Sequence, residues 1–339
     1  MDDHKSERQL MREIPLRIDY LYFLGYELGE AIPNHSVLSK ARKRWGSEVF
    51  VSLFTRTVEQ CLKAGLIDGR KLHLDGSLVR ADASLNSVVQ ITLGKLDKEQ
   101  EAPKSSCSDE DQNPPKDKRP VNERFRVETD PEATLVRHGK GKSLPSYKVH
   151  RGIDDKFGVI TAVETTTGAT AESDQLPELV EQHQKLTGFK PKAVVGDTGY
   201  GTTQNFITLA QAGIRSHMAD LRLKQNNIRQ EGIYPAEAFA YDSAQDRYRC
   251  KAGRYLSRHH YVKDRGYVEY RTPEGVCGRC RLKHLCTRAK AGRTLKRYEN
   301  QELLDRARRQ SHGPAAKKDR RKRKWMMEGS FGRARWNTE

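Results

Sequence analysis

The sequence predicts an α/β fold in which helices flank a mixed β-sheet. Strand-like and helix-like segments alternate between residues 69 and 222, as they do in such folds. Residues 1–68 contain helical patterns, and residues 223–300 interrupt the alternation with many tyrosines and four cysteines. We therefore expect a helical N-terminal segment (1–68), an α/β core (69–222), an inserted module (223–300) and a basic C-terminal helix that completes the core (301–339).

The spacing of apolar residues predicts helices in the N-terminal segment. Ser6 followed by Gln9 has the pattern of a capping box, and Gly46 is placed to end a helix. The next stretch places one apolar set on a single helical face: Phe50, Leu53, Phe54, Val58, Cys61 and Leu62. A basic second helix fits a DNA-binding helix-turn-helix, and ordinary bundle packing fits equally well. The segment is expected to serve DNA binding or dimerisation.

Strands and helices follow one another through the core. KLHLDGSLVRADAS repeats every two residues, as a strand does, and Asp154–Gly158 lies between two β runs that predict a hairpin. DQLPELVEQHQKLTG reads as an amphipathic helix ending at Gly188, and KAVVGD, TTQNFITLAQAG and IRSHMAD follow as strand, helix and strand. Residues 95–123 are polar and nearly free of large apolar groups, so we expect a disordered loop there.

The chain is strongly basic. It has 62 Lys and Arg against 45 Asp and Glu, a net charge of +17 and a pI near 9.6. KKDRRKRK, at 317–324, concentrates this excess near the C-terminus, which indicates nucleic acid or an anionic membrane surface as the partner. A solvated basic face is the alternative. No apolar run is long enough for a membrane span and the N-terminus is polar, so we expect a cytoplasmic protein with reduced cysteines.

Three acidic residues are candidates for a catalytic site. In KAVVGDTGYG an apolar run ends on Asp197, between glycines that would leave room for a ligand; a simple turn is the alternative. Asp75 also lies in a β run and precedes a glycine, and Glu328 is the one acid between Asp319 and the terminal Glu339. Carboxylates that converge can hold two Mg²⁺ or Mn²⁺ ions about 3.5–4 Å apart for phosphoryl transfer.

Glu328 lies in a basic helical stripe with Arg321, Lys324 and Arg335. The functional interpretation is a metal ligand flanked by cations that bind phosphates. The alternative is a Lys324–Glu328 ion pair worth about 0.3–0.5 kcal/mol. Gly329 and Gly332 would each cost about 1 kcal/mol inside a helix, which predicts that this helix lies close to a sheet or to a DNA backbone.

Several segments resemble DDE transposases of bacterial insertion sequences, whose catalytic core has an RNase H-like fold. The resemblance rests on LHLDGSLVRADAS, TDPEATLVRHGKGKSLPSYKVHRGID, AVVGDTGYG and WMMEGSFGRAR. It implies that Asp75, Asp197 and Glu328 are the catalytic and metal-binding acids. In that family the late helix often carries a Tyr, an Arg and a Lys around the Glu. Here the Tyr is absent and the Arg and Lys are exchanged, and these two residue types are not equivalent phosphate ligands.

The resemblance also implies a function. The enzyme would use Mg²⁺ or Mn²⁺ to cut DNA and to join the freed 3′ hydroxyl to a second phosphodiester. Its partners would be terminal inverted repeats, target DNA and a second copy of the chain in a nucleoprotein homodimer, with the bound protein associated with the nucleoid. Similar proteins continue beyond the point that corresponds to Arg335, so an inactive, truncated remnant that only binds DNA is one alternative. A nuclease of RNase H-like fold is another.

The remaining candidates are cysteines, tyrosines and isolated basic residues. Four thiols in the insert suit a structural Zn²⁺ site, with buried free thiols as the alternative: Cys250, Cys277, Cys280 and Cys286. Similar transposases carry such cysteines. The insert tyrosines either stack on bases or alternate along strands. Lys148, with His150, and Tyr200 are candidates for DNA contacts, and packing is the alternative for Tyr200.

Overall fold

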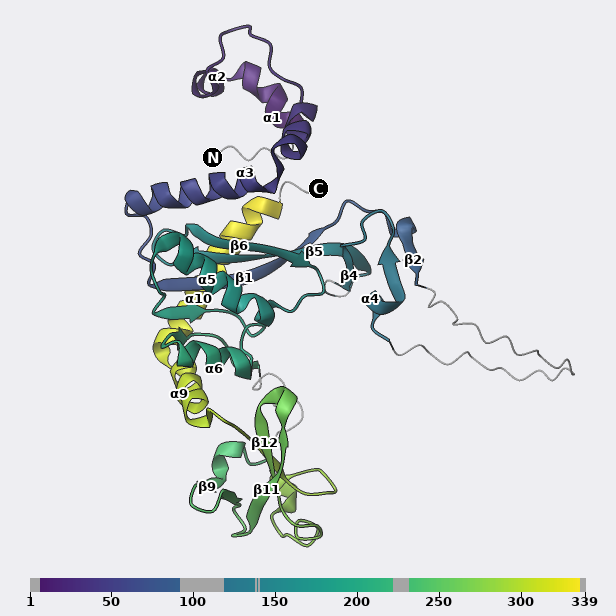
Figure 1. Ribbon diagram of the computed structural model, residues 1–339, viewed down its shortest axis with the longest axis vertical. Coiled ribbons are helices and arrows are strands. Elements are labelled where there is room, and N and C mark those ends of the chain that lie inside the picture. Colours follow the sequence, from purple (N-terminus) through teal and green to yellow (C-terminus); the bar gives the residue numbers. More distant parts are fainter. Residues whose placement is uncertain (1–6, 92–118, 138, 140, 222–231, 336–339) are drawn as a thin grey trace, which may run out of the picture. The chain divides into compact units, whose positions relative to one another are not determined.

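The computed structural model describes residues 7–91, 119–137, 139, 141–221 and 232–335 (Figure 1). The chain divides into two compact units. The first comprises Met1–Asp68, Leu74–Phe189 and Gly329–Glu339, and the second comprises Gly69–His73 and Lys190–Glu328. The boundary falls inside strand β1 (Lys71–Arg80) and inside helix α10 (Pro314–Arg335), so each of these elements contributes residues to both units.

The first unit begins with the expected helices, α1 (Glu7–Glu13), α2 (Ile18–Leu24) and α3 (Ser36–Lys63). Gly46 adopts φ 69° and ψ −179°, outside helical geometry, so α3 consists of two helices that meet at this residue, and the first of them ends at Gly46 as the sequence predicts. Of the six residues on the expected apolar face, only Val58 is buried, and Leu53 remains 52% exposed. The DNA-binding or dimerisation role of this segment stays a prediction.

An antiparallel sheet and one helix form the core of the first unit. Strand β5 (Ser143–Asp154) pairs with β4 (Thr134–Arg137) and with β6 (Ile160–Thr167), which confirms the expected hairpin. Helix α5 (Leu176–Thr187) packs on β5 and β6 through Leu176, Leu179 and Val180 (Figure 1). It ends at Gly188 in the left-handed conformation, as its sequence predicts.

A small second sheet joins β2 (Val88–Gln90) to β3 (Phe125–Val127). Most of the expected disordered loop, residues 95–118, lies outside the described residues, as do Ser6 and Cys107. The end of that loop is helical instead, because Val121–Arg124 form α4. The Asn122 side chain anchors this turn by accepting the Leu135 N–H at 2.8 Å and donating to the Leu135 carbonyl at 3.3 Å.

Parallel strands lie at the centre of the second unit. The first residues of β1 pair with β7 (Ala193–Val195) in the register Lys71↔Ala193, Leu72↔Val194 and His73↔Val195, and β7 pairs in parallel with β8 (Arg215–Ser216). Helix α6 (Thr203–Gln211) begins at a Thr202 side-chain cap and packs against α9 (Gln301–His312). Parallel pairs here and antiparallel pairs in the first unit make the architecture mixed α/β with flanking helices, which confirms the predicted fold class.

The insert is a five-stranded antiparallel sheet in the order β13-β12-β11-β10-β9. Its strands are β9 (Ala240–Asp242), β10 (Arg247–Arg249), β11 (Tyr255–Val262), β12 (Tyr267–Arg271) and β13 (Thr294–Tyr298). One apolar cluster holds them together: Phe239, Tyr248, Leu256, Tyr270 and Leu295. Strand packing therefore accounts for these buried tyrosines, whereas Tyr255 and Tyr261 are exposed and base stacking by them stays a prediction.

The C-terminal region contains two helices where the sequence analysis expects one. Gly313 has extended backbone between α9 and α10, and Pro314 begins α10. Proline suits the first turn of a helix because it has no N–H to donate and its φ is already helical. None of the helices in the described part of the chain has the length and apolarity that a membrane crossing requires.

Candidate active site and its supports

Asp75 and Asp197 occupy equivalent positions relative to the parallel register. His73 pairs with Val195, and each candidate aspartate comes two residues later in its own segment. Both side chains are partly buried. The Oδ1 atom of Asp197 accepts the N–H of Gly199 at 2.7 Å, and Oδ1 of Asp75 accepts the N–H of Gly76 at 2.9 Å. Each carboxylate is thus oriented by the backbone that follows it.

Gly196 and Gly201 make room for the protein's own residues rather than for a ligand. A Cβ atom on Gly196 would lie 3.0 Å from Cβ of Tyr200, and one on Gly201 would lie 1.8 Å from the carbonyl oxygen of Ala219. Tyr200 is completely buried. The expectation that Tyr200 contacts DNA is therefore wrong, because its ring is part of the core.

Glu328 lies on an exposed face of α10. Arg321 and Lys324 are exposed with it, while the neighbouring Met326 and Met327 are buried and anchor the helix. No Lys324–Glu328 ion pair forms in the described chain. Arg335 is the last residue of α10.

The surroundings of Gly329 contradict the expectation that α10 lies close to a sheet at this residue. A Cβ atom placed on it would meet nothing within 4 Å. The prediction that Gly329 permits a close approach to the sheet is therefore wrong.

The basic residues of β5 are already engaged within the protein. Lys148 donates through Nζ to the carbonyl oxygen of Thr170 at 2.7 Å. His150 is completely buried, with Nε2 3.0 Å from the Thr166 hydroxyl, so its predicted DNA contact is wrong. Burial, helped by the charge of Lys148, lowers the pKa of His150 to about 4. The ring is thus neutral near pH 7.

A buried carboxylate that the sequence analysis did not single out links three segments of the second unit. Asp319 of α10 accepts from Lys71 Nζ at 2.9 Å and from His217 Nδ1 at 2.7 Å. Burial would raise the pKa of Asp319, but the hydrogen bonds from Lys71 and His217 bring it below its usual value. Burial lowers the pKa of His217, against the opposing hydrogen bond with Asp319. We conclude that Asp319 is ionised, Lys71 supplies the compensating charge, and neutral His217 donates its Nδ1–H.

A second buried ion pair lies on α9. Arg308 Nε is 2.9 Å from Asp220 Oδ2, and its NH2 group donates to the Thr203 hydroxyl at 3.2 Å. Ser311, one turn further along α9, donates through its hydroxyl to the carbonyl oxygen of Met218. These contacts tie α9 to the start of α6 and to the segment after β8. The sequence alone does not reveal these contacts, because the partners are about 90 to 105 residues apart along the chain.

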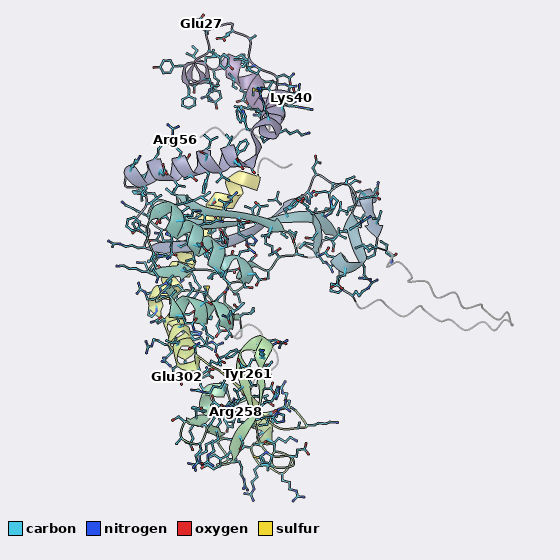
Figure 2. The ribbon with its side chains drawn as sticks, viewed as in Figure 1. Glu27, Lys40, Arg56, Arg258, Tyr261 and Glu302 are labelled. Atoms are coloured by element: carbon cyan, nitrogen blue, oxygen red, sulfur yellow. The ribbon has the colours of Figure 1, made fainter. Side chains whose placement is uncertain are left out.

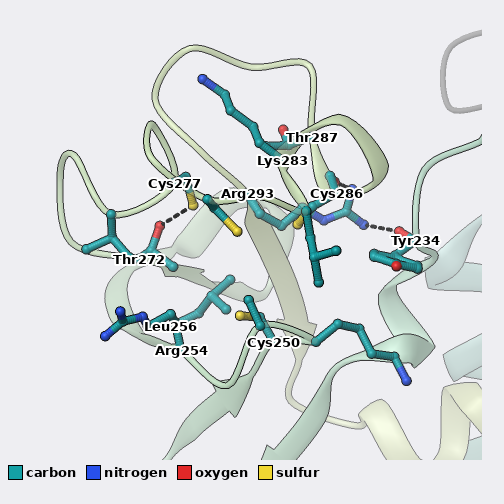
Figure 3. A pocket seen from close by; sticks show the side chains of 15 residues that line it. Tyr234, Cys250, Arg254, Leu256, Thr272, Cys277, Lys283, Cys286, Thr287 and Arg293 are labelled. Carbon is teal, nitrogen blue, oxygen red and sulfur yellow. Dashed lines mark hydrogen bonds between the residues drawn. The ribbon is translucent and has the colours of Figure 1, made fainter.

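The four cysteines of the insert line one small cavity of about 30 Å³ (Figure 3). Cys277 Sγ lies 3.0 Å from the Thr272 hydroxyl, and Arg293 donates to the backbone carbonyls of Cys286 and Tyr234. Burial raises the pKa of the Cys286 thiol, which the charge of Arg293 opposes. In the part of the chain that the structure describes, no three His, Cys, Asp or Glu side chains are grouped to hold a metal ion.

Two family models match the chain. The model described as Transposase DDE domain matches residues 124–335, and the model described as Transposase domain (DUF772) matches residues 1–44. The first match covers more than half of the chain, so the protein belongs to the DDE transposase family, as its sequence motifs predict, and its α/β sheet is consistent with the RNase H-like fold. Asp197 and Glu328 lie inside that match, and Asp75 precedes it. No curated protein and no solved structure matches the chain.

Proposed function

We propose that this transposase cleaves DNA and transfers the cut strand in a reaction that depends on divalent metal ions and on Asp75, Asp197 and Glu328. The observation that carries the proposal is the parallel register of β1 and β7, since both aspartates follow the paired residues His73 and Val195 by two positions. Asp75 lies within β1, and Asp197 lies in the loop that follows β7. Glu328, exposed on α10, is the proposed third acid.

The donor set fits Mg²⁺ or Mn²⁺, because hard cations prefer the oxygen atoms of carboxylates. When bound, such ions stabilise charge on phosphoryl oxygens and make the attacking water more acidic. Backbone N–H groups hold one oxygen of Asp75 and one of Asp197, which orients both carboxylates. In the described part of the chain, Oδ2 of Asp197 accepts no hydrogen bond, so it is available as a ligand.

Two displacements at phosphorus constitute the proposed reaction. In the first, a water oxygen bonds to phosphorus, the P–O3′ bond breaks, and the 3′ oxygen leaves with a proton as a hydroxyl. In the second, that 3′ hydroxyl attacks a target phosphodiester, which releases another 3′ hydroxyl. Arg321, Lys324 and Arg335 are proposed to bind the DNA phosphates beside Glu328. Positioning and electrostatic stabilisation supply most of the acceleration in such transfers.

A cleavage assay tests the proposal. The protein is incubated with Mg²⁺ or Mn²⁺ and DNA that carries the ends of the element, for the wild type, Asp197→Asn and the control Asp264→Asn. Asp264 is exposed and lies in the insert, so it matches the change of charge without touching the site. We expect end-specific nicks with 3′ hydroxyls, at least about 100-fold slower in Asp197→Asn and unchanged in Asp264→Asn.

Two other outcomes would contradict the proposal. Binding without cutting by the wild type would identify an inactive DNA-binding remnant. Cutting without preference for the element ends would identify a nuclease. A homodimer on the DNA, the assembly proposed for strand transfer, is measured in the same samples by the mass of the complex.

A structural Zn²⁺ ion at Cys250, Cys277, Cys280 and Cys286 remains part of the proposal. The shared cavity supports it, because thiolates in one place are the preferred ligands of zinc. As they stand, the four thiols are not grouped tightly enough to bind a metal, so binding would need them to move inward. One zinc per chain in the purified wild type, absent from Cys277→Ser, would support the site. A metal-free, folded wild type would leave these residues as packed thiols.

A further inference from the structure

Two segments of the insert carry a dense group of positive charges. Residues 250–256 and 275–293 contain no Asp or Glu, and both segments line the cysteine cavity, which places them on either side of it. We call their exposed cations the basic cap: Lys251, Arg254, Arg279, Arg281, Arg288 and Lys290.

Three arginines of the insert's sheet are paired with acids, whereas most cations of the basic cap, like Lys263 and Arg265 among the described residues, are not. On the sheet, Arg247 is paired with Asp242 at 3.2 Å, Arg258 with Asp246 at 3.4 Å, and Arg271 with Glu269 at 2.7 Å. Among the described residues, five members of the cap form no ion pair: Lys251, Arg254, Arg279, Arg281 and Lys290. Uncompensated like charges on one small surface repel each other, and an anionic partner relieves that repulsion.

Hydrogen bonds connect the backbone of the two segments that carry the cap. Cys250 donates its N–H to the carbonyl of Arg254 at 2.8 Å, and Thr287 donates to the carbonyl of Lys283 at 2.9 Å. Arg293 ties the second segment to Tyr234 through hydrogen bonds to two backbone carbonyls. Figure 3 shows Cys250 and Cys286 facing the same cavity from the two segments.

We propose that the basic cap binds the phosphate backbone of duplex DNA. The insert, residues 232–300, holds 16 Lys and Arg against 7 Asp and Glu, so it carries about half of the protein's net charge of +17 in a fifth of its length. Long cationic side chains on loops can reach the evenly spaced phosphates of a duplex. Binding through such contacts does not depend on the base sequence. This inference rests on the proposed function, in which DNA is the substrate. It assigns one surface of the insert to the binding of that DNA.

Salt dependence of DNA binding tests the assignment, with the full chain and a duplex that carries an element end. The test variant is Arg279→Gln with Arg281→Gln, and the matched control is Lys263→Gln with Arg265→Gln. The control removes the same charge from the same insert, at the turn between β11 and β12. Strand β11 leads from the cap to this turn, and Figure 2 shows Arg258 and Tyr261 along it.

The expected result is a change of slope. Each phosphate contact contributes about 0.9 to the slope of log K against log salt concentration, so losing two should flatten it by about 1.8. The control should keep the wild-type slope, and Arg279→Lys with Arg281→Lys should restore it. Equal slopes for the test and control variants would overturn the assignment. A wild type that binds no DNA at all would overturn the proposed function as well, so the two failures are distinguishable. Melting temperatures equal to the wild type's verify that the exposed substitutions leave the fold intact.

Discussion

Gly201 shows how strongly a single backbone position near Asp197 is constrained. A Cβ atom there would lie 1.8 Å from the carbonyl oxygen of Ala219, which is backbone and cannot rotate away. We expect Gly201→Ala to destabilise the protein by about 1–3 kcal/mol in urea unfolding, because overpacking forces the backbone to shift. The matched substitution Gly329→Ala enters open space on a helix and should stabilise by up to about 1 kcal/mol. Equal effects at the two glycines would contradict the packing described here.

The titration of His150 is expected to make the free energy of unfolding depend on pH. Burial lowers the pKa of its imidazole to about 4 in the folded protein, whereas the unfolded chain titrates near 6.5. Between these values the unfolded state binds a proton that the folded state does not. The free energy of unfolding should therefore fall as the pH falls from 6.5 to about 4, by up to about 3 kcal/mol for this group.

The variant His150→Gln isolates that contribution. It retains a polar side chain for the Thr166 hydroxyl but has no proton to gain over this range. The difference in unfolding free energy between the wild type and the variant should shrink as the pH falls toward 4. A difference independent of pH would show that His150 does not titrate as described.

At the scale of elements, one buried carboxylate positions α10. Asp319 and Glu328 are nine residues apart, which is about 13 Å along the helix and half a turn around it. This geometry explains why Asp319 is buried while Glu328 is exposed. The contacts of Asp319 with Lys71 and His217 hold α10 against the start of β1 and the end of β8.

Asp319→Asn should destabilise the second unit by about 1–3 kcal/mol near pH 7, because it removes the charged partner of the Lys71 ammonium, whose side chain is 32% exposed. The pKa of Asp319 lies below its ordinary value of 3.8 in the folded protein. Its contribution is present above that value and is lost as the pH falls through the lowered pKa. The unfolding curves of wild type and variant should therefore converge in acid. The exposed control Asp264→Asn should stay within about 0.5 kcal/mol of the wild type at every pH.

Element boundaries could be read from the sequence where local chemistry sets them. Gly188 ends α5 and the Asp154–Gly158 turn joins β5 to β6, as their sequences predict. The burial pattern of β1 could not be read in this way. Its two-residue repeat predicts one apolar face, yet Leu72, His73 and Leu74 are all buried. Both faces of this strand are covered, and that depends on segments far away in the sequence.

At the scale of the whole molecule, the three acids are expected to act as one unit although 253 residues separate the first from the last. Asp75→Asn, Asp197→Asn and Glu328→Gln should each remove nearly all cleavage. Combining Asp75→Asn with Asp197→Asn should cause little further loss, because residues of one catalytic unit are strongly non-additive. Single-turnover cleavage by the single and double variants measures this. Losses that multiply in the double variant would assign the acids to independent roles.

The sequence by itself determined the order of the main strands and helices from Asp154 to His217, the two aspartates in or after β runs, and the membership in the transposase family. Those features are local, since periodicity, turn residues and short motifs need no knowledge of what packs against them. Only the tertiary structure decided that Tyr200 is core, that Gly196 and Gly201 accommodate the protein itself, and that Asp319 joins Lys71 to His217. Burial and ion pairing depend on which distant segments meet, and side chains 102 and 248 residues from Asp319 in the sequence meet it only when the chain has folded.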